Sequence, residues 1–371
     1  MAAGSLRCLL RIAAAGYGIA VGARNFLYSR GWLKARRVDA AVISVGNITV
    51  GGTGKTPLVV WLCNLIMHNF KSQIADFKCA ILTRGYKSRV PETESFKDEV
   101  AILAESCPGA KVIVNPDRVA GAAEAVGRFG AKVLVMDDGF QHRRLARDLD
   151  IVAVDATEPF GYGKLLPAGL LREPVASLKR ADAVVITRCD QVPEAELDEL
   201  ERRLLAIHPD MVVARSIHAP VYVEFPDASV IPANAGIHEE GGRVDSCLRR
   251  NDSIRQLKSR KVFAFCGIGN PDAFLSSIRN LGAELAGSTV YDDHYHYTQR
   301  SLADIRADAE ASGADIILTT QKDWTKVSGL TRPGKGVPLA YLCIEMKFLA
   351  GQDRLTSLIE RTLAGRMSQG G

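Results

Sequence analysis

Short runs of apolar residues alternate along most of the chain with longer segments in which apolar residues recur at helical spacing. The short runs are nearly continuous in Val, Ile, Leu and Ala, which is typical of strands covered by helices on both faces. Segments such as 56–68 and 118–129 lie between them and have the helical period. This alternation predicts a doubly wound α/β domain with a mostly parallel sheet. The expected strands are residues 41–45, 78–82, 111–114, 132–136, 150–154 and 181–187.

A second, shorter series of the same kind begins at residue 261 and predicts a smaller α/β domain. The last amphipathic run, 352–363, can belong to either domain. The expected strands of the second series are residues 261–265, 315–319 and 339–343, with helices after Pro271 and over 298–311.

Residues 227–256, between the two series, have neither the helical nor the strand period. Their sequence resembles that of translated palindromic repeat elements. We therefore interpret about 25 of these residues as an insertion in a surface loop, where long insertions are tolerated. An ordinary interdomain linker is the alternative. The expected organisation is an N-terminal helix (1–40), a larger α/β domain (41–218), a smaller domain with a flexible insertion (219–350) and a C-terminal helix and tail (351–371).

Composition narrows the class of protein. Of the 371 residues, 47% are hydrophobic and 24% are charged, which excludes a disordered, collagen-like or disulfide-scaffold chain. The eight cysteines are at least 16 residues apart, so no C-x-x-C zinc or redox pair is present. They are expected to be reduced structural thiols.

The strongest local motif is Ile43-Ser44-Val45-Gly46-Asn47-Ile48-Thr49-Val50-Gly51-Gly52-Thr53-Gly54-Lys55-Thr56, which predicts a strand, a glycine-rich turn and a helix start. Backbone N–H groups of such a turn converge on phosphate oxygens, the lysine reaches the β- and γ-phosphates, and the threonine hydroxyl ligates Mg²⁺. The usual spacing would place a first glycine where this chain has a threonine. The expected nucleotide-binding residues are Thr49, Gly51, Gly52, Thr53, Gly54, Lys55 and Thr56.

Two adjacent carboxylates, Asp137 and Asp138, end the predicted strand 132–136. A phosphate loop requires an acidic residue on a neighbouring strand to hold Mg²⁺, and two carboxylates this close are costly unless a cation lies there. Gln141 and His142 follow and are expected just beyond the metal site.

The first 38 residues contain seven Lys and Arg and no Asp or Glu, while the rest of the chain has 40 basic and 42 acidic residues. A nucleic-acid-binding protein would spread its basic surface over the folded domain, so we expect no nucleic-acid partner and an anionic membrane surface instead. The longest uncharged run, 12–23, is too short to span a bilayer.

The same segment has helical spacing, which predicts an interfacial amphipathic helix. Arg7 and Arg11 share one stripe of it. Two alternatives remain, a helix packed on its own domain and a signal peptide with a cleavage-like end at Ala23. The apolar stripe expected to face the membrane is Leu6, Leu10, Tyr17 and Val21.

Several motifs together resemble those of the tetraacyldisaccharide 4'-kinase family, whose members phosphorylate the lipid A precursor of Gram-negative bacteria. The resemblance covers residues 1–345 except the insertion. It implies an ATP- and Mg²⁺-dependent kinase that is peripheral or monotopic on the cytoplasmic face of the inner membrane. Its acceptor would be a tetraacyldisaccharide 1-phosphate lipid. The sequence leaves the oligomeric state open, and a monomer is favoured. The motifs are residues 46–57, Arg84-Gly85-Tyr86, residues 137–142, Leu171-Arg172-Glu173-Pro174 and residues 265–271.

The resemblance also implies roles for individual residues. Asp98 matches the family's candidate base, although the flanking Gly and Pro of the family motif are replaced here by Lys97 and Val100. His294 matches the histidine that the family pairs with this aspartate, and it would orient Asp98 or balance its charge. Beside the phosphates, Arg172 would neutralise developing charge, and Glu173 would reach the metal directly or through water.

Two other functions fit parts of the chain. Thr187-Arg188-Cys189-Asp190 resembles the guanine-reading motif [NT]-K-x-D and indicates a GTPase, a reading that leaves Asp98 and His294 without a role. Residues 51–56 resemble the loop of partition ATPases, which indicates a non-catalytic, membrane-recruited scaffold. That class has a lysine before the first glycine, where this chain has Val50.

Overall fold

The computed structural model describes residues 2–70, 76–85, 94–226, 253–293, 295–331 and 336–368. The chain forms two compact units. Unit 1 consists of residues 1–87, 103–218 and 346–371, and unit 2 of residues 88–102 and 219–345. Two long strands, β7 (Val212–Glu224) and β11 (Leu339–Ala350), contribute residues to both units.

Unit 1 is built on a parallel sheet with the order β3-β2-β4-β1-β5-β6-β7. Every pairing along this order is parallel, which confirms the predicted doubly wound fold. Val45 in β1 is in register with Asp137 in β4, so the carboxyl ends of these two strands lie side by side. The strands are β1 (Ala41–Gly46), β2 (Cys79–Thr83), β3 (Ala110–Val114), β4 (Val133–Asp137), β5 (Leu149–Asp155) and β6 (Ala183–Thr187).

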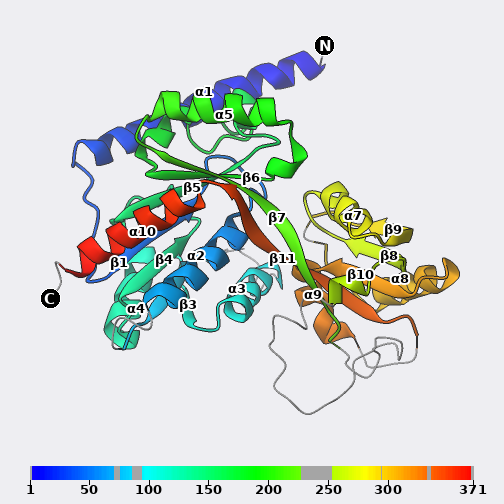
Figure 1. Ribbon diagram of the computed structural model, residues 1–371. Helices are drawn as coiled ribbons and strands as arrows, with labels where there is room; N and C mark the ends of the chain where they lie inside the picture. Colours follow the sequence, from blue (N-terminus) through cyan, green and yellow to red (C-terminus); the bar gives the residue numbers. More distant parts are fainter. Residues whose placement is uncertain are drawn as a thin grey trace. The chain divides into compact units, whose positions relative to one another are not determined.

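Helices cover both faces of this sheet, and every residue of its central strands β1, β4, β5 and β6 is therefore buried. Alternate side chains of β1 separate the faces, with Ile43 packing towards α2 (Lys55–Phe70) and α10 (Gln352–Met367) and Val42 towards α4 (Arg118–Phe129). On the α4 face, α5 (Glu194–Ile207) packs over β5 and β6. Figure 1 shows α2 and α10 on one side of the sheet and α1 and α5 on the other.

Unit 2 is a smaller parallel α/β unit, as predicted, with the strand order β11-β10-β8-β9. Thr298 caps α8 together with Ser301, and Asn270 caps α7, which begins with a proline. Besides its part of β11, the unit contains β8 (Lys261–Cys266), α7 (Pro271–Asn280), β9 (Glu284–Val290), α8 (Gln299–Ala311), β10 (Ile316–Thr320) and α9 (Gln321–Val327).

Some elements were not predicted. The sequence does not predict β7 and β9, because neither strand has a continuous apolar run. β7 contains charged residues and Pro220, and every position of β9 is exposed or half-buried. α3 (Glu94–Ser106) lies between β2 and β3. Most of the predicted insertion, 227–252, lies outside the described residues, and the described chain resumes at Ser253, whose hydroxyl accepts from the Val223 N–H at 2.9 Å.

The N-terminal segment forms one long helix, α1 (Ala2–Ser29), within unit 1. The prediction that the stripe containing Leu10, Tyr17 and Val21 faces the membrane is wrong, because this stripe packs against the helix's own unit. Val21 is buried, and the Tyr17 hydroxyl donates to the Arg172 carbonyl at 2.8 Å. The side chain of Leu6 lies outside the described residues.

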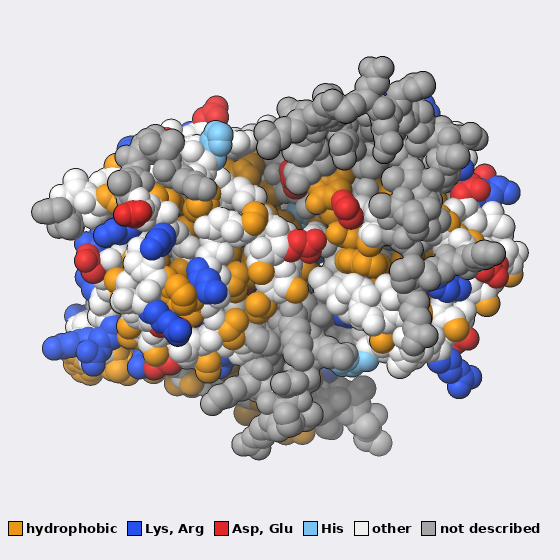
Figure 2. Space-filling view, turned by 90° about the horizontal axis from the view of Figure 1, so that it is seen from below, with side chains coloured by type: hydrophobic (Ala, Val, Ile, Leu, Met, Phe, Trp, Pro, Cys, Tyr) orange, Lys and Arg blue, Asp and Glu red, His pale blue; other side chains and the backbone are white. Residues whose placement is uncertain are grey.

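The opposite side of α1 is exposed and apolar. Leu9, Ile12, Ile19 and Phe26 are between 51% and 74% exposed, and their spacing places them along one face of the helix. Among the described residues, no helix is long and apolar enough to cross a bilayer. The face of the molecule in Figure 2 carries separate Lys and Arg side chains with acidic side chains between them.

Candidate active site

The predicted phosphate loop joins the end of β1 to the first turn of α2 in unit 1. Gly51 and Gly54 have φ of +112° and +80°, a backbone region that glycine adopts without a Cβ clash. A side chain at Gly54 would also lie 2.5 Å from the His218 Nε2 atom. The loop therefore presents backbone N–H groups at a helix N-terminus, where anions are favoured.

Buried polar side chains hold the shape of this loop. Asn47 is fully buried and donates from its side-chain amide to Thr53 Oγ1 at 2.9 Å, while its backbone carbonyl accepts from Gln141 Nε2 at 2.7 Å. Thr49 is also buried and forms an antiparallel bridge with Leu171. Asn47 and Gln141 therefore stabilise the loop from within. Gln141 was expected just beyond the metal site, and its amide contacts the loop itself.

Asp138 lies at the centre of the charged groups around the loop. Both oxygens of its carboxylate accept from Arg172 Nη1, at 2.9 and 2.8 Å, and Lys55 Nζ lies 3.6 Å away. Burial alone would raise the pKa of Asp138, but the charges of Lys55 and Arg172 outweigh burial and lower this pKa below its usual value. The site therefore holds a carboxylate that stays ionised.

A buried arginine that was not predicted lies beside these carboxylates. Arg118 is 3% exposed and donates to the Asp137 carbonyl at 2.9 Å, and burial lowers its pKa to about 10. A sequence signal for it existed, since Arg118 is the first residue of α4, where a cation opposes the helix dipole and requires a compensating partner.

His142 ends a tight turn in which its backbone N–H donates to the Gly139 carbonyl at 2.8 Å. Burial first, then the charges of Arg118 and other nearby arginines, lower the pKa of His142 to about 4. The imidazole is therefore neutral at physiological pH, and its buried Nε2 has no partner in the described part of the chain. Arg84 is exposed just beyond β2, and Tyr86 lies outside the described residues.

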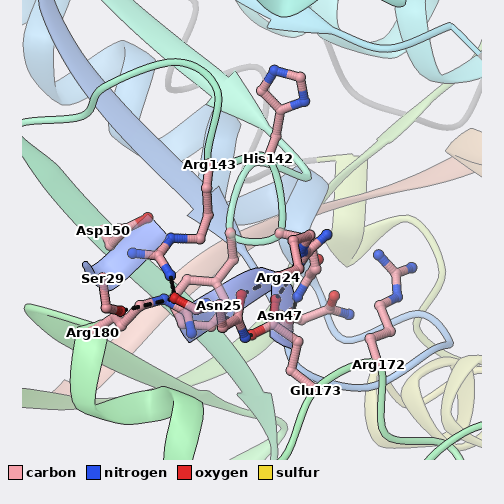
Figure 3. Close-up of polar contacts among 12 residues, drawn as sticks. Arg24, Asn25, Ser29, Asn47, His142, Arg143, Asp150, Arg172, Glu173 and Arg180 are labelled. Atoms are coloured by element: carbon pink, nitrogen blue, oxygen red, sulfur yellow. Dashed lines mark hydrogen bonds and ion pairs between the residues drawn. The ribbon is translucent and has the colours of Figure 1, made fainter. Parts of the chain in front are cut away.

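Glu173, predicted as a metal ligand, has different surroundings in the structure. It is fully buried, and its carboxylate accepts from Arg24 at 3.1 Å, Asn25 at 2.9 Å and Arg180 at 2.9 Å. Figure 3 shows Arg24 and Asn25 of α1 beside this carboxylate. These contacts join α1 to the segment that carries Arg172, and they give the metal-ligand prediction no support.

We expect Glu173→Gln to lower the free energy of unfolding by about 3 kcal/mol, because removing one partner of a buried ion pair leaves the other charge uncompensated. Arg24→Gln should cost less, since the Arg24 side chain is 40% exposed and water can solvate its charge. Urea unfolding of both variants measures the difference. Equal losses would mean that Glu173 does not hold this cluster together.

The proposed base Asp98 lies in α3, but its side chain is outside the described residues, as is His294. Their predicted pairing therefore stays a prediction. On the neighbouring described residue, Asp293, the carboxylate accepts from Lys322 Nζ at 2.9 Å.

The segment that resembles a guanine-reading motif packs against the phosphate loop. The Thr187 hydroxyl donates to the Thr53 carbonyl at 3.0 Å, and Arg188 donates to the Gly52 carbonyl and pairs with Asp155. These contacts give the Thr187–Arg188 segment a part in supporting the loop. Asp155 was not predicted, although it ends β5 in the same way that Asp137 ends β4.

His218, also not predicted, packs against the loop at Gly54. Burial, reinforced by the charge of Arg188, lowers its pKa to about 4, and Asp155 opposes the shift only in part. Between pH 6.5 and 4 the unfolded state therefore binds a proton that the folded state does not. Stability is full above pH 6.5 and falls as the pH falls towards 4.

We expect His218→Gln to weaken the loss of stability in acid. Each pH unit in the window from 6.5 to 4 should cost the unaltered protein up to about 1.4 kcal/mol at this histidine, and the variant should lack this contribution. Urea unfolding at several pH values between 7 and 4.5 measures it. An identical slope in both proteins would show that His218 is not buried in its neutral form.

Known proteins resemble this chain over nearly its whole length. The family model described as tetraacyldisaccharide-1-P 4'-kinase matches residues 6–364. A tetraacyldisaccharide 4'-kinase of Geobacter metallireducens is 35% identical over 96% of this chain and 98% of its own length, and one of Anaeromyxobacter sp. (strain K) is 34% identical over 96% and 90%. A crystal structure of LpxK from Aquifex aeolicus in complex with ATP is 28% identical, with a TM-score of 0.67, over 96% of this chain and 99% of that one.

Proposed function

The chain belongs to the tetraacyldisaccharide 4'-kinase family, and from this premise we infer that it transfers the γ-phosphoryl group of ATP to the 4'-hydroxyl of a tetraacyldisaccharide 1-phosphate. The observation that carries the inference is the convergence of Lys55, Arg172 and Asp138 at the phosphate loop. A GTPase or a non-catalytic scaffold is not favoured, because the whole chain matches a kinase family.

The loop would bind the triphosphate through its backbone N–H groups and Lys55. Lys55 and Arg172 both point at Asp138 and so bring two positive charges to one place. Negative charge spreads over the transferred group in the transition state, and fixed cations stabilise it without reorganising. We assign this stabilisation to Lys55 and Arg172.

Asp137, Asp138 and Thr56 form a donor set that fits Mg²⁺, because carboxylate and hydroxyl oxygens are its preferred protein ligands. The lowered pKa of Asp138 keeps one of these donors ionised. When bound, the ion would neutralise charge on the β- and γ-phosphates. Glu173 is left out of this set, since it is fully buried and its carboxylate is held by Arg24, Asn25 and Arg180, whereas the Asp138 side chain is 38% exposed.

We propose Asp98 as the base that accepts the proton of the 4'-hydroxyl and His294 as the residue that orients it. The resemblance to the family supports both assignments. A carboxylate contributes to such a transfer only when it is within hydrogen-bonding reach of the hydroxyl. His294 would therefore act by orienting the Asp98 carboxylate towards the 4'-hydroxyl.

The experiment that tests the function is incubation with [γ-³²P]ATP, Mg²⁺ and a tetraacyldisaccharide 1-phosphate, followed by separation of the lipids. A bis-phosphorylated product is expected. Competition by unlabelled ATP but not by GTP distinguishes the kinase from a GTPase. ATP turnover that occurs with no phosphorylated lipid would instead favour the scaffold ATPase.

We further propose that unit 1 approaches the cytoplasmic face of the inner membrane through the exposed side of α1. An acceptor whose acyl chains stay in the bilayer must be reached at the membrane surface. Leu9, Ile12, Ile19 and Phe26 offer an apolar face for burial, and the basic residues of the segment would interact with anionic headgroups.

Ile19→Glu should reduce binding to anionic vesicles in high salt by roughly tenfold or more, because it places a charge where an apolar side chain would enter the membrane. Ile19 is 74% exposed, so the fold should be unaffected. Vesicle sedimentation across a salt series measures binding. Val114→Glu, at an exposed apolar residue of β3, is the matched control. Equal binding of the two variants would contradict the assignment of this face.

A further inference from the structure

A surface cavity of about 570 Å³ lies beside the C-terminal end of α1, within unit 1. One wall is formed by Tyr28 and the segment 31–35, and the other by residues of the 143–150 segment together with Arg180. No residue assigned above to the nucleotide, the metal or the base lines it.

The charged groups that line the cavity are mostly basic. They are Lys34, Arg143, Arg147 and Arg180, against the single carboxylate of Asp150. Arg147 pairs with Asp150 at 2.8 Å and thereby neutralises it. Three positive charges remain in the wall.

The carboxylate of Glu173 does not balance these three charges, because it is shared between Arg180 and Arg24. In the described part of the chain, no carboxylate forms an ion pair with Arg143 or Lys34. The Arg143 guanidinium instead donates to the Asn25 carbonyl at 2.9 Å and lies 5.1 Å from the centre of the Tyr28 ring. The cluster therefore has an excess of positive charge, which is half-buried at Arg143 and Arg180 and exposed at Lys34.

Two polar atoms in the wall are buried and unpartnered among the described residues, Arg180 Nε and Asp150 Oδ1. Figure 3 shows Arg143, Arg180 and Asp150 gathered near Asn25 and Ser29 of α1. Burial, and after it the charges of Arg180 and Arg147, lower the pKa of Arg143, and the charge of Glu173 opposes this shift only in part. An arginine in such a place is stabilised by a bound anion, and its fork of donors matches phosphate.

The rim of the cavity is apolar and exposed. Leu33 lines the cavity, and the neighbouring Trp32 is 73% exposed. Trp32 meets Phe26 edge to face, with the ring centroids 6.4 Å apart, and Phe26 belongs to the outer side of α1. Exposed tryptophan beside basic residues is typical of a membrane–water interface.

We propose that this cavity is a second phosphate site, separate from the phosphate loop, which binds the phosphate group of an anionic lipid. The phosphate would lie between Lys34, Arg143 and Arg180, and the apolar part of the lipid would lie along Trp32 and Leu33. A bilayer phospholipid and the acceptor's own 1-phosphate share this chemistry.

The first arm of the test uses the full chain and two kinds of phosphatidylcholine vesicle with equal surface charge, one containing phosphatidic acid and the other oleate. The unaltered protein should bind the phosphate-bearing vesicles about tenfold or more tightly than the carboxylate-bearing ones, because only phosphate fits several arginine donors at once. Lys34→Gln and Arg143→Gln should remove most of this preference.

Arg36→Gln is the matched control, since Arg36 is an exposed basic residue close in sequence that does not line the cavity. It should weaken binding to both kinds of vesicle alike, at most about fivefold. Lys34 is also exposed, so Lys34→Gln keeps the test valid if Arg143→Gln loosens α1.

The second arm measures KM for the acceptor in neutral detergent micelles, and it alone rests on the proposed function. If the acceptor's 1-phosphate occupies the cavity, Arg143→Gln and Lys34→Gln raise KM about tenfold with little change in kcat. If a bilayer phospholipid occupies it, KM in neutral micelles is unchanged and only vesicle preference is lost.

The proposal is overturned if the unaltered protein shows no preference for phosphate-bearing vesicles and neither variant changes KM. It is also overturned if Arg36→Gln removes the preference as completely as Lys34→Gln. A protein that lacks kinase activity but keeps the vesicle preference would refute the proposed function and leave this site in place.

Discussion

Lys55→Ala is expected to lower the rate of phosphoryl transfer by about 100-fold or more, because the lysine supplies charge to the transferred group in the transition state. Its Nζ lies 3.6 Å from Asp138, and the side chain is 15% exposed at the first residue of α2. No apolar contact of the core is lost, so the fold should remain. Asp138→Ala should have a loss of similar size, since it removes the partner of both Lys55 and Arg172.

Transfer of labelled phosphate to the lipid acceptor measures both losses, and thermal unfolding checks the fold. Lys132→Ala, at an exposed lysine just before β4, removes the same charge far from the loop and should leave the rate unchanged. A Lys55→Ala enzyme within tenfold of the unaltered rate would contradict the assignment of the phosphate loop. A variant that unfolds at a much lower temperature would instead show that Lys55 is structural.

Asp98→Ala and His294→Ala are each expected to lower kcat by about 100-fold or more, and the double variant should lose little beyond either single one. The physical reason is that a residue which only orients the base has no effect once the base is gone. Asp98→Asn keeps the shape of the side chain but cannot accept a proton, so it should be as inactive as Asp98→Ala.

Rates for the two single variants and the double variant form a thermodynamic cycle. Multiplicative losses would mean that the two residues act separately. A His294→Ala variant with an unchanged kcat and a raised KM would place His294 in acceptor binding. In either case Lys55→Ala should still be inactive, so this test of the base is independent of the phosphate loop.

The chain itself determined the architecture and the position of the phosphate loop. Nearly continuous apolar runs such as 41–45 and 132–136 are typical of strands covered on both faces, and the glycines of 51–54 permit a turn that other residues resist. Because both signals are local in sequence, they can be recognised without knowing what packs against them. The two carboxylates at 137–138 follow from the same rule, since parallel strands bring their ends to one edge.

Tertiary structure alone decided which side of α1 is buried, what Glu173 contacts and where His218 lies. Val21 and Ile19 are both apolar residues of one helix, and only the surface on which α1 packs makes Val21 buried and Ile19 exposed. Glu173 meets Arg24 across 149 residues of chain, a separation over which sequence spacing carries no information. Long-range contacts of this kind depend on the packing of finished elements, so the residues that brace this site become recognisable only in the folded protein.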